Sequence, residues 1–247
     1  MRAILLAAGR GRRLGIDEPK SLLRFSGRSL LERHLDHLVA CGIDQLTVVV
    51  GHKKELLQAE LDRVRRQREQ AGAPLGLDVE TLFNELYERS SIVSLQRAGD
   101  RLRDGAVWMD ADVLYPRELL RRLVESPSPN AALIDASASE GGEEMMLAAN
   151  GGRVVKVGRK VGEGFEVVGE SVGFYKVDPS GGAAMKKALD AEVAAGRMDQ
   201  EHEDAMRIAL EEVPFGFERI DDLPWTEIDF AEDVAKAEKL AVQIDQD

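Results

Sequence analysis

Residues 2–15 read Arg2-Ala-Ile-Leu-Leu-Ala-Ala8-Gly9-Arg10-Gly11-Arg12-Arg13-Leu14-Gly15. After Arg2 this stretch is apolar up to Ala8, without polar alternation, which is typical of a strand buried on both faces of a parallel sheet. The glycines that follow let a backbone approach an anion closely, and the arginines add positive charge. Open α/β sheets bind ligands at the carboxyl ends of their strands. The stretch therefore predicts a phosphate-binding loop after a buried first strand.

The rest of the first half alternates between strand and helix patterns. Short apolar runs at 45–50, 77–82 and 106–109 predict strands, and periodic segments at 29–41, 53–70, 91–103 and 116–124 predict helices. Alternation of this kind predicts an α/β fold, with a Rossmann-like, mostly parallel sheet and helices on both faces.

The second half has a different pattern. Asn150-Gly151 between Met145–Ala149 and Val154–Val157 is a hairpin signal, and helices are expected at 183–195, 201–211 and 231–242. We expect one domain over residues 1–247, with an antiparallel elaboration in its second half.

Composition excludes several classes of protein. The chain has 247 residues and a formal net charge of −12, which argues against binding nucleic acid through its general surface. Cys41 is the one cysteine, so there is no intramolecular disulfide and no cysteine-based zinc site. No apolar run approaches the ~18 residues that a membrane span needs. We expect a cytoplasmic protein with no membrane partner, as a monomer or a homodimer.

The glycine loop differs from two familiar phosphate loops. A P-loop ends in Gly-Lys-Ser/Thr, which is absent from this stretch. A dinucleotide fingerprint needs Gly-x-Gly-x-x-Gly, but here the third glycine, Gly15, comes one residue late.

Leu-Ala-Ala-Gly-x-Gly-x-Arg-Leu followed by Pro19-Lys20-Ser-Leu resembles the start of nucleotidyltransferases that couple a nucleoside triphosphate to a phosphorylated small molecule. Within them the chain is most similar to phosphocholine and phosphonate (2-aminoethylphosphonate) cytidylyltransferases and to related sugar-1-phosphate enzymes. The resemblance implies a GT-A-like fold. It implies a nucleotide-binding half over about residues 1–135 and an acceptor-binding half over about 136–247.

The same resemblance assigns roles to the loop. Arg13 and Lys20 would contact the triphosphate and stabilise charge on the α-phosphate, as a reaction that needs cations more than a protein nucleophile requires. The remaining loop positions that would bind the nucleotide are Leu6, Ala8, Gly9, Arg10, Gly11 and Arg12.

Two acidic segments predict a metal site. Asp110 and Asp112 follow a strand and, two residues apart on an extended backbone, point the same way. Carboxylates at such a position suit Mg²⁺, which keeps substrate phosphates and water as its other ligands. The resemblance implies that Asp112 and Asp229 of Glu227-Ile-Asp229 hold Mg²⁺, while Asp110 assists at the nucleotide.

The resemblance also divides the remaining candidates between two pockets. Gly51, Ser90 and Ser91 would bind the nucleobase. The acceptor would be bound by Tyr87, Lys160, Glu170, Asp204, Trp225 and Glu227. Aromatic rings with carboxylates are a composition suited to an ammonium group.

The resulting hypothesis is a Mg²⁺-dependent transfer from CTP, or another nucleoside triphosphate, to a small phosphate or phosphonate such as phosphocholine or 2-aminoethylphosphonate. The alternatives are a sugar- or polyol-phosphate nucleotidyltransferase, a metal-dependent glycosyltransferase, and a non-catalytic nucleotide-sensing domain. The cations of the loop favour a triphosphate over a nucleotide sugar, and a silent domain commonly lacks one of these charged groups. Pyrophosphate release from a triphosphate and a phosphorylated acceptor separates these alternatives.

Overall fold

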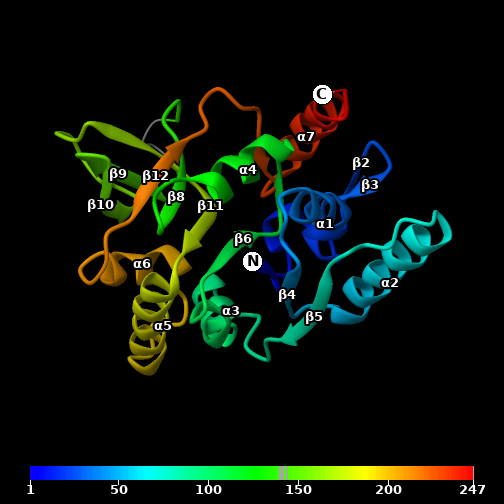
Figure 1. The fold of residues 1–247 in the computed structure, drawn as a ribbon, viewed down its shortest axis with the longest axis horizontal. Helices are drawn as coiled ribbons and strands as arrows, with labels where there is room; N and C mark the ends of the chain where they lie inside the picture. The colour runs from blue at the N-terminus through cyan, green and yellow to red at the C-terminus, as the bar shows by residue number, and fades with distance from the viewer. Residues whose placement is uncertain (139–141, 143, 247) are drawn as a thin grey trace.

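The centre of the computed structural model, which describes residues 1–138, 142 and 144–246, is a mixed sheet of nine strands (Figure 1). Its parallel part confirms the α/β prediction, because β1 (Arg2–Ala7) lies between β4 (Gln45–Val50) and β6 (Ala106–Asp110). β5 (Asp78–Phe83) pairs with β4 on the outer side. The carboxyl ends of β1, β4 and β6 therefore meet at one edge of the sheet.

Both faces of β1 are buried, as its sequence predicts. Ala3, Leu5 and Ala7 pack into one core, whereas Ile4 and Leu6 pack into another. The first core is completed by α1 (Leu30–Ala40), α2 (Lys54–Gln70) and α4 (Arg117–Glu125). The second is completed by α3 (Ser91–Arg97), α5 (Pro179–Ala194) and α6 (His202–Ala209).

The antiparallel elaboration is built around one long strand, β11 (Val167–Val177). Its C-terminal half pairs with β6, its N-terminal half pairs with β9 (Met146–Asn150), and β8 (Ala131–Asp135) pairs along both halves. The expected hairpin is formed by β9 and β10 (Arg153–Gly158), and β12 (Gly216–Arg219) pairs with β8. The parallel sheet and the elaboration are thus one continuous sheet.

Several boundaries differ from those expected from the sequence. The helix expected at 91–103 divides at Ala98 into α3 and a 3₁₀ turn, η3 (Gly99–Leu102). The helix expected from 183 begins at Pro179, because Asp178 caps its N-terminus by accepting the Gly181 N–H at 2.8 Å. Strands β8 and β12 were not anticipated.

Four two-residue strands lie near the C-terminal helix α7 (Ala231–Ile244). They form two ribbons, β2 (Arg24–Phe25) with β3 (Arg28–Ser29), and β7 (Val113–Leu114) with β13 (Thr226–Glu227). α7 packs on both ribbons through a small apolar cluster, which we call the satellite core. Its buried members are Phe25, Leu30, Leu114, Ile228, Ala237, Leu240 and Ala241, with Leu14, Leu23, Val234 and Ile244 at its edge.

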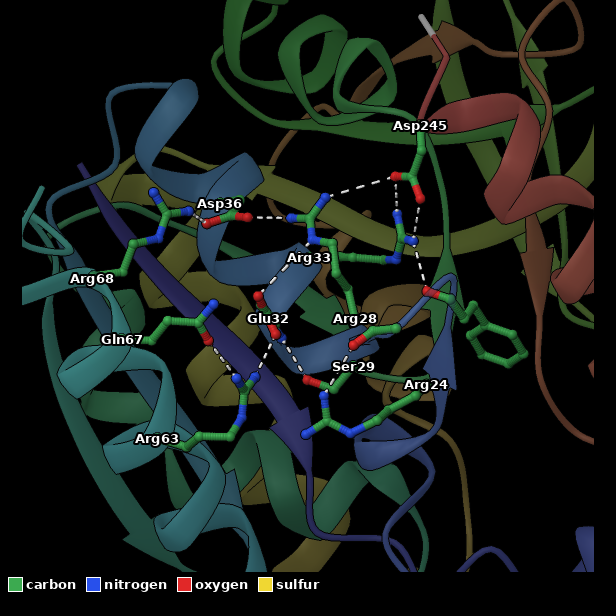
Figure 2. Close-up of polar contacts among 12 residues, drawn as sticks. Arg24, Arg28, Ser29, Glu32, Arg33, Asp36, Arg63, Gln67, Arg68 and Asp245 are labelled. Atoms are coloured by element: carbon green, nitrogen blue, oxygen red, sulfur yellow. Dashed lines mark hydrogen bonds and ion pairs between the residues drawn. The ribbon is translucent and has the colours of Figure 1, made fainter. Parts of the chain in front are cut away.

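A network of charged side chains joins α1 to α2 (Figure 2). Arg63 pairs with Glu60 at 2.8 Å and with Glu32, and Asp36 pairs with both Arg28 and Arg68. The same network continues from Arg28 and Arg33 to Asp245 at the end of α7. Among the helices of the described residues, none has the length and apolar character needed to cross a membrane.

Candidate active site

A cavity of about 890 Å³ opens at the carboxyl ends of β1 and β6. This volume is within the range of pockets that bury small-molecule ligands. The glycine loop, the acids after β6, the start of α3, the start of α6 and the segment before α7 all line the cavity. The predicted site residues on this wall are Leu6, Ala8, Gly9, Arg10, Gly11, Arg12, Arg13, Lys20, Tyr87, Ser90, Ser91, Asp110, Asp112, Glu170, Trp225, Glu227 and Asp229.

Three carboxylates from distant segments converge in the cavity. The ribbon of β7 and β13 opposes Glu227 to Val113, and the Ile228 N–H donates to the Asp112 carbonyl at 3.0 Å. This pairing brings carboxylate oxygens of Asp112, Glu227 and Asp229 within 4.8 Å of one another. The short ribbon, which was not anticipated, is therefore the element that assembles the acidic cluster.

Two cations lie against these carboxylates. The Lys20 ammonium is 2.9 Å from Asp112 Oδ2 and also donates to Asp229, while Arg13 donates to Asp229 Oδ2 at 2.8 Å. Lys20 enters the 3₁₀ turn η2 (Lys20–Leu22) directly after Pro19, and Arg13 lies in η1 (Arg12–Leu14). The two cations and two of the acids that the sequence singled out are thus brought into direct contact.

The ionisation of these groups follows from their contacts. Burial alone would lower the pKa of Lys20, but the carboxylates of Asp112 and Asp229 raise it above its ordinary value. Burial would raise the pKa of Asp229, but Lys20 and then Arg13 hold it below its usual range. At neutral pH Lys20 is therefore positively charged and Asp229 is negatively charged.

Glu227 has the opposite tendency. Its position inside the cleft removes part of its hydration, and the carboxylates of Asp112 and Asp229 repel its charge, so its pKa is raised well above the ordinary value. The side chain itself remains open to the solvent that fills the cleft.

The donor set fits a hard divalent cation. Carboxylate oxygens are the ligands that Mg²⁺ prefers, and an open cleft leaves room for water and phosphate oxygens as further ligands. The ammonium of Lys20 between two of the acids shows that this position favours positive charge. Asp112 and Asp229, with Glu227 beside them, could therefore hold such an ion.

A second group of potential ligands lies at the end of β6. Atoms of Asp110, His202 and Glu203 lie within 4.8 Å of one another. Burial and then the Glu203 carboxylate raise the pKa of Asp110 well above its ordinary value. Glu203 accepts hydrogen bonds from Tyr175 at 3.2 Å and Ser171 at 3.4 Å. Sequence reasoning missed His202 as a cavity residue, because nothing but its place at the start of a helix distinguishes it.

The two serines at the start of α3 share one carboxylate. Ser90 and Ser91 donate to Glu201 Oε2 at 2.7 and 2.6 Å. Glu201 lines the cavity from the start of α6. It was not predicted as a site residue, and only its acidic neighbours in the sequence could have signalled it.

Gly51 lies beneath this part of the cavity and is not on its wall. A β-carbon at Gly51 would lie 2.3 Å from Cβ of Tyr87 and 2.6 Å from the carbonyl oxygen of Ala8. Only a glycine lets Tyr87 pack so closely against the end of β4. The structure therefore places Tyr87 beside Gly51, one of the residues expected to bind the base.

The remaining predicted acceptor residues divide into two groups. Trp225 is half-buried, and its indole N–H donates to Asp135 at 2.8 Å. Glu170 lines the same region, where burial and then Glu144 and Asp135 raise its pKa to about 7. Lys160 and Asp204 do not line this cavity.

Neighbours of these two residues occupy the wall in their place. Arg159 lines the cavity, whereas the Lys160 side chain is exposed outside it. Glu203 lines the cavity, whereas Asp204 accepts the Glu201 N–H at 3.1 Å and completes a capping box on α6. Helix capping therefore accounts for Asp204 without a ligand.

This fold is the one that the sequence predicts for a nucleotidyltransferase, and the predicted glycine loop and acids lie at the carboxyl ends of its strands. Residues 3–163 match the model of a family described as a MobA-like NTP transferase domain, and the chain belongs to this family.

Relatives of known activity are similar over different lengths. The chain is 25% identical over 244 residues to the bifunctional IPC transferase and DIPP synthase of Thermococcus kodakarensis, covering 98% of this chain and 51% of that protein. It is 30% identical over 136 residues to the CMP-5'-(3-aminopropyl)phosphonate synthase of Streptomyces rubellomurinus, covering 53% of this chain and 20% of that protein. The chain thus spans about half or less of these relatives.

Among solved structures, the inositol-1-phosphate CTP transferase from T. maritima has a TM-score of 0.77 and 19% identity, with 99% of this chain and 96% of that chain covered. At this identity the likeness supports the fold, and it extends through both halves of the sheet.

Proposed function

We propose that this protein is a cytidylyltransferase, which transfers CMP from CTP to a small phosphorylated or phosphonate acceptor and requires Mg²⁺. The observation that carries the proposal is the contact of Lys20 and Arg13 with the Asp112 and Asp229 carboxylates beside the glycine loop. Transfer of a nucleotidyl group spreads negative charge around the α-phosphate. Cations fixed in this way stabilise that charge without a protein nucleophile.

The reaction exchanges one phosphorus–oxygen bond for another. An oxygen of the acceptor bonds to the α-phosphorus, the bond from that phosphorus to the β-phosphate oxygen breaks, and pyrophosphate leaves. The acceptor oxygen is already ionised at neutral pH, so no general base is needed. Lys20 and Arg13 orient and neutralise the triphosphate, and Asp112 and Asp229 would hold Mg²⁺. When bound, the ion supplies further charge neutralisation and a template for alignment.

The hydrogen-bond direction at Ser90 supports cytosine as the base. Because Ser90 Oγ–H donates to Glu201, its oxygen is left as an acceptor at the cavity wall. Cytosine presents an exocyclic amine at the position where uracil presents a carbonyl oxygen. A wall with acceptors therefore favours CTP over UTP.

The negative charge on the part of the cavity wall near Trp225 supports an acceptor that carries an amine. Glu170, Asp135 and Glu144 lie together there, and Lys236 partly offsets their charge. An ammonium group would relieve the repulsion and could also lie against the Trp225 ring. The phosphonate relative described above is named for a CMP-linked aminopropyl phosphonate, which carries an amine. In this proposal residues 1–135 mainly bind the nucleotide and residues 136–247 mainly bind the acceptor.

A matched substrate panel tests the proposal. Pyrophosphate release is measured with each of CTP, UTP, ATP and GTP against 2-aminoethylphosphonate, phosphocholine, ethylphosphonate, glucose 1-phosphate and inositol 1-phosphate. Ethylphosphonate is the control, because it lacks only the amine of 2-aminoethylphosphonate. We expect CTP with an amine-bearing acceptor to give the highest kcat/KM. If glucose 1-phosphate or inositol 1-phosphate were a better acceptor, the proposal that the acceptor carries an amine would be wrong. If no combination of triphosphate and acceptor released pyrophosphate, the proposed activity would be wrong.

Trp225→Ala tests the acceptor pocket directly. Loss of a cation–π contact should raise the KM for the amine-bearing acceptor by about 2- to 30-fold, with little change for CTP. Trp225→Phe is the control, because it keeps a ring while removing the N–H that donates to Asp135. If both variants raised the KM for the acceptor equally, the role of Trp225 would be its hydrogen bond to Asp135 rather than a contact with the amine.

A further inference from the structure

The position of Asp229 depends on the start of α7. The Asp233 carboxylate in the first turn accepts the N–H groups of Asp229 at 2.9 Å and of Phe230 at 2.7 Å. On its other side, Asp229 comes shortly after the two-residue strand β13, and a pair of such short strands has little stability of its own. The backbone position of Asp229 is therefore tied to how α7 is docked, while Lys20 and Arg13 contact its carboxylate directly.

The satellite core docks α7 against the segments that carry Arg13, Lys20, Asp112 and Asp229. The core is small, and its apolar residues come from the glycine loop, the turn of Lys20, the ribbon and α7 itself. Each charged group has a neighbour in it: Leu14 beside Arg13, Leu23 after Lys20, Leu114 after Asp112, and Ile228 before Asp229. A shift of α7 on this core therefore changes the geometry between the acids and the cations.

The far end of α7 is held by a buried arginine. Arg33 donates to both carboxylate oxygens of Asp245, each at 2.7 Å, and to the Phe25 carbonyl of the β2–β3 ribbon at 2.8 Å (Figure 2). Its side chain is 3% exposed. Asp245 is the C-cap of α7, where the helix dipole disfavours negative charge, so the bidentate arginine offsets an otherwise unfavourable position.

We propose that Arg33 is a positioning residue for nucleotidyl transfer: by clamping Asp245 it fixes α7, and through α7 it fixes the Asp229 carboxylate beside Lys20 and Asp112. The inference rests on the proposed function. α7 has 14 residues and is about 21 Å long, so its C-terminal end lies far from the reacting groups. Without the clamp the C-terminal end of the helix is held by the satellite core and by the longer contact of Arg28 with Asp245 at 3.7 Å, and it can tilt. The backbone of Asp229, bonded to the first turn, tilts with it.

The test compares two acids of the same charged network. Asp245→Asn removes the charge that Arg33 holds on α7. Asp36→Asn is the control, because Asp36 pairs with Arg28 and Arg68 outside α7, and its substitution leaves in the chain both arginines that contact Asp245, Arg33 and Arg28. Arg33→Lys, which keeps the charge but loses the two-pronged geometry, is a third variant for the case in which Asp245→Asn folds poorly.

Three readouts are measured on each variant: kcat and KM for pyrophosphate release, Mn²⁺ affinity by electron paramagnetic resonance with nucleotide present, and amide exchange over residues 231–244. We expect Asp245→Asn and Arg33→Lys to lower kcat roughly 10- to 10²-fold, the scale for a misplaced reacting group, with KM for CTP within about twofold. Mn²⁺ affinity should fall and exchange in α7 should accelerate. Asp36→Asn should leave all three readouts as in the wild type.

Wild-type kcat and Mn²⁺ affinity in Asp245→Asn would overturn the clamp. A loss of kcat in Asp36→Asn as large as in Asp245→Asn would also overturn it, because the effect would then follow general stability. If the wild type released no pyrophosphate with any triphosphate, the proposed function would fail. Mn²⁺ affinity and amide exchange would still decide whether Arg33 positions α7.

Discussion

Lys20 is an ammonium group between two carboxylates, and this contact defines the chemistry at the scale of single residues. A cation in such a position lowers the repulsion between Asp112 and Asp229 in the free protein. In the proposed reaction its charge would serve the triphosphate, and Asp112 and Asp229 would hold Mg²⁺. The same side chain thus stabilises the site before substrate binds and the charge on phosphate afterwards.

Lys20→Ala should reduce kcat by about 10²-fold or more, the scale for losing one preorganised charge donor. Asp229→Ala should reduce it similarly and also weaken Mn²⁺ binding. Steady-state pyrophosphate release and Mn²⁺ titration measure both effects, and circular dichroism controls for folding. A Lys20→Ala enzyme altered only in the KM for the acceptor would contradict a role at the triphosphate.

Ser90→Ala should weaken discrimination between bases rather than the reaction itself. The change removes one acceptor for the cytosine amine, so the ratio of kcat/KM for CTP to that for UTP should fall roughly 2- to 10-fold. Ser180→Ala is a suitable control, because Ser180 donates to Asp178 at the start of α5 and is not among the residues of the cavity wall. An unchanged ratio in Ser90→Ala would remove this residue from base recognition.

At the scale of elements, the parallel half was the easier half to predict. The patterns of β1, β4, α1 and α2 are local, because one strand or helix is recognised from its own residues. β8 and β12 were missed because their apolar character makes sense only against partners far along the chain: β8 pairs with β11, and β12 pairs with β8. The ribbon that assembles the acids has only two residues per strand, too few for any periodicity.

The site follows the same rule. The sequence could predict which residues of the glycine loop and of β6 line the cavity, because they lie in one compact motif or shortly after a strand. Examples are Gly9, Arg13, Lys20 and Asp112. Glu201 and His202 were not, since they reach the cavity from α6 through packing between helices.

Two glycines in α5 explain why the sequence predicts a start at residue 183, later than the observed start at Pro179. Gly181 and Gly182 suggest a break in the sequence, yet both lie in the first turns of the helix. A β-carbon at Gly182 would lie 1.8 Å from the carbonyl oxygen of Leu102, so this position needs glycine for close packing.

Gly182→Ala should therefore destabilise the protein by about 1–3 kcal/mol, although alanine favours helices. Urea denaturation measures the change. Lys187→Ala, on the exposed side of the same helix, should cost less than about 1 kcal/mol, because it removes only a surface ion pair with Glu212. A stabilised Gly182→Ala variant would show that η3 can move away from α5.

At the scale of the whole molecule, stability should depend on two histidines in α1, the buried His34 and the half-buried His37. Burial lowers the pKa of His34 to about 4, and burial together with the nearby charges lowers that of His37 to about 3. In the unfolded chain both titrate near 6.5. Below that pH the unfolded state therefore binds more protons than the folded state, so stability falls as the pH decreases from about 6.5 toward 4.

For His34 alone this slope should reach about 1.4 kcal/mol per pH unit. We expect His34→Gln to flatten the dependence of the unfolding free energy on pH between 5 and 6.5, whatever its effect at pH 7. Glu170, whose folded pKa is raised, opposes the trend equally in both proteins and cancels in the comparison. If the unfolding free energies of the wild type and His34→Gln had the same pH dependence, the pKa of His34 would not be lowered by folding. Water would then reach the ring in the folded protein.

The contact of Lys20 with Asp229 joins residues that are 209 positions apart in the chain. Contacts of such long range close large loops and form late in folding. During synthesis, the glycine loop and its lysine leave the ribosome long before Asp229 has been made. A nascent chain can thus fold its parallel strands and still have no complete reaction centre. Nucleotidyl transfer should begin only when the last acid arrives, which couples the onset of activity to the end of folding.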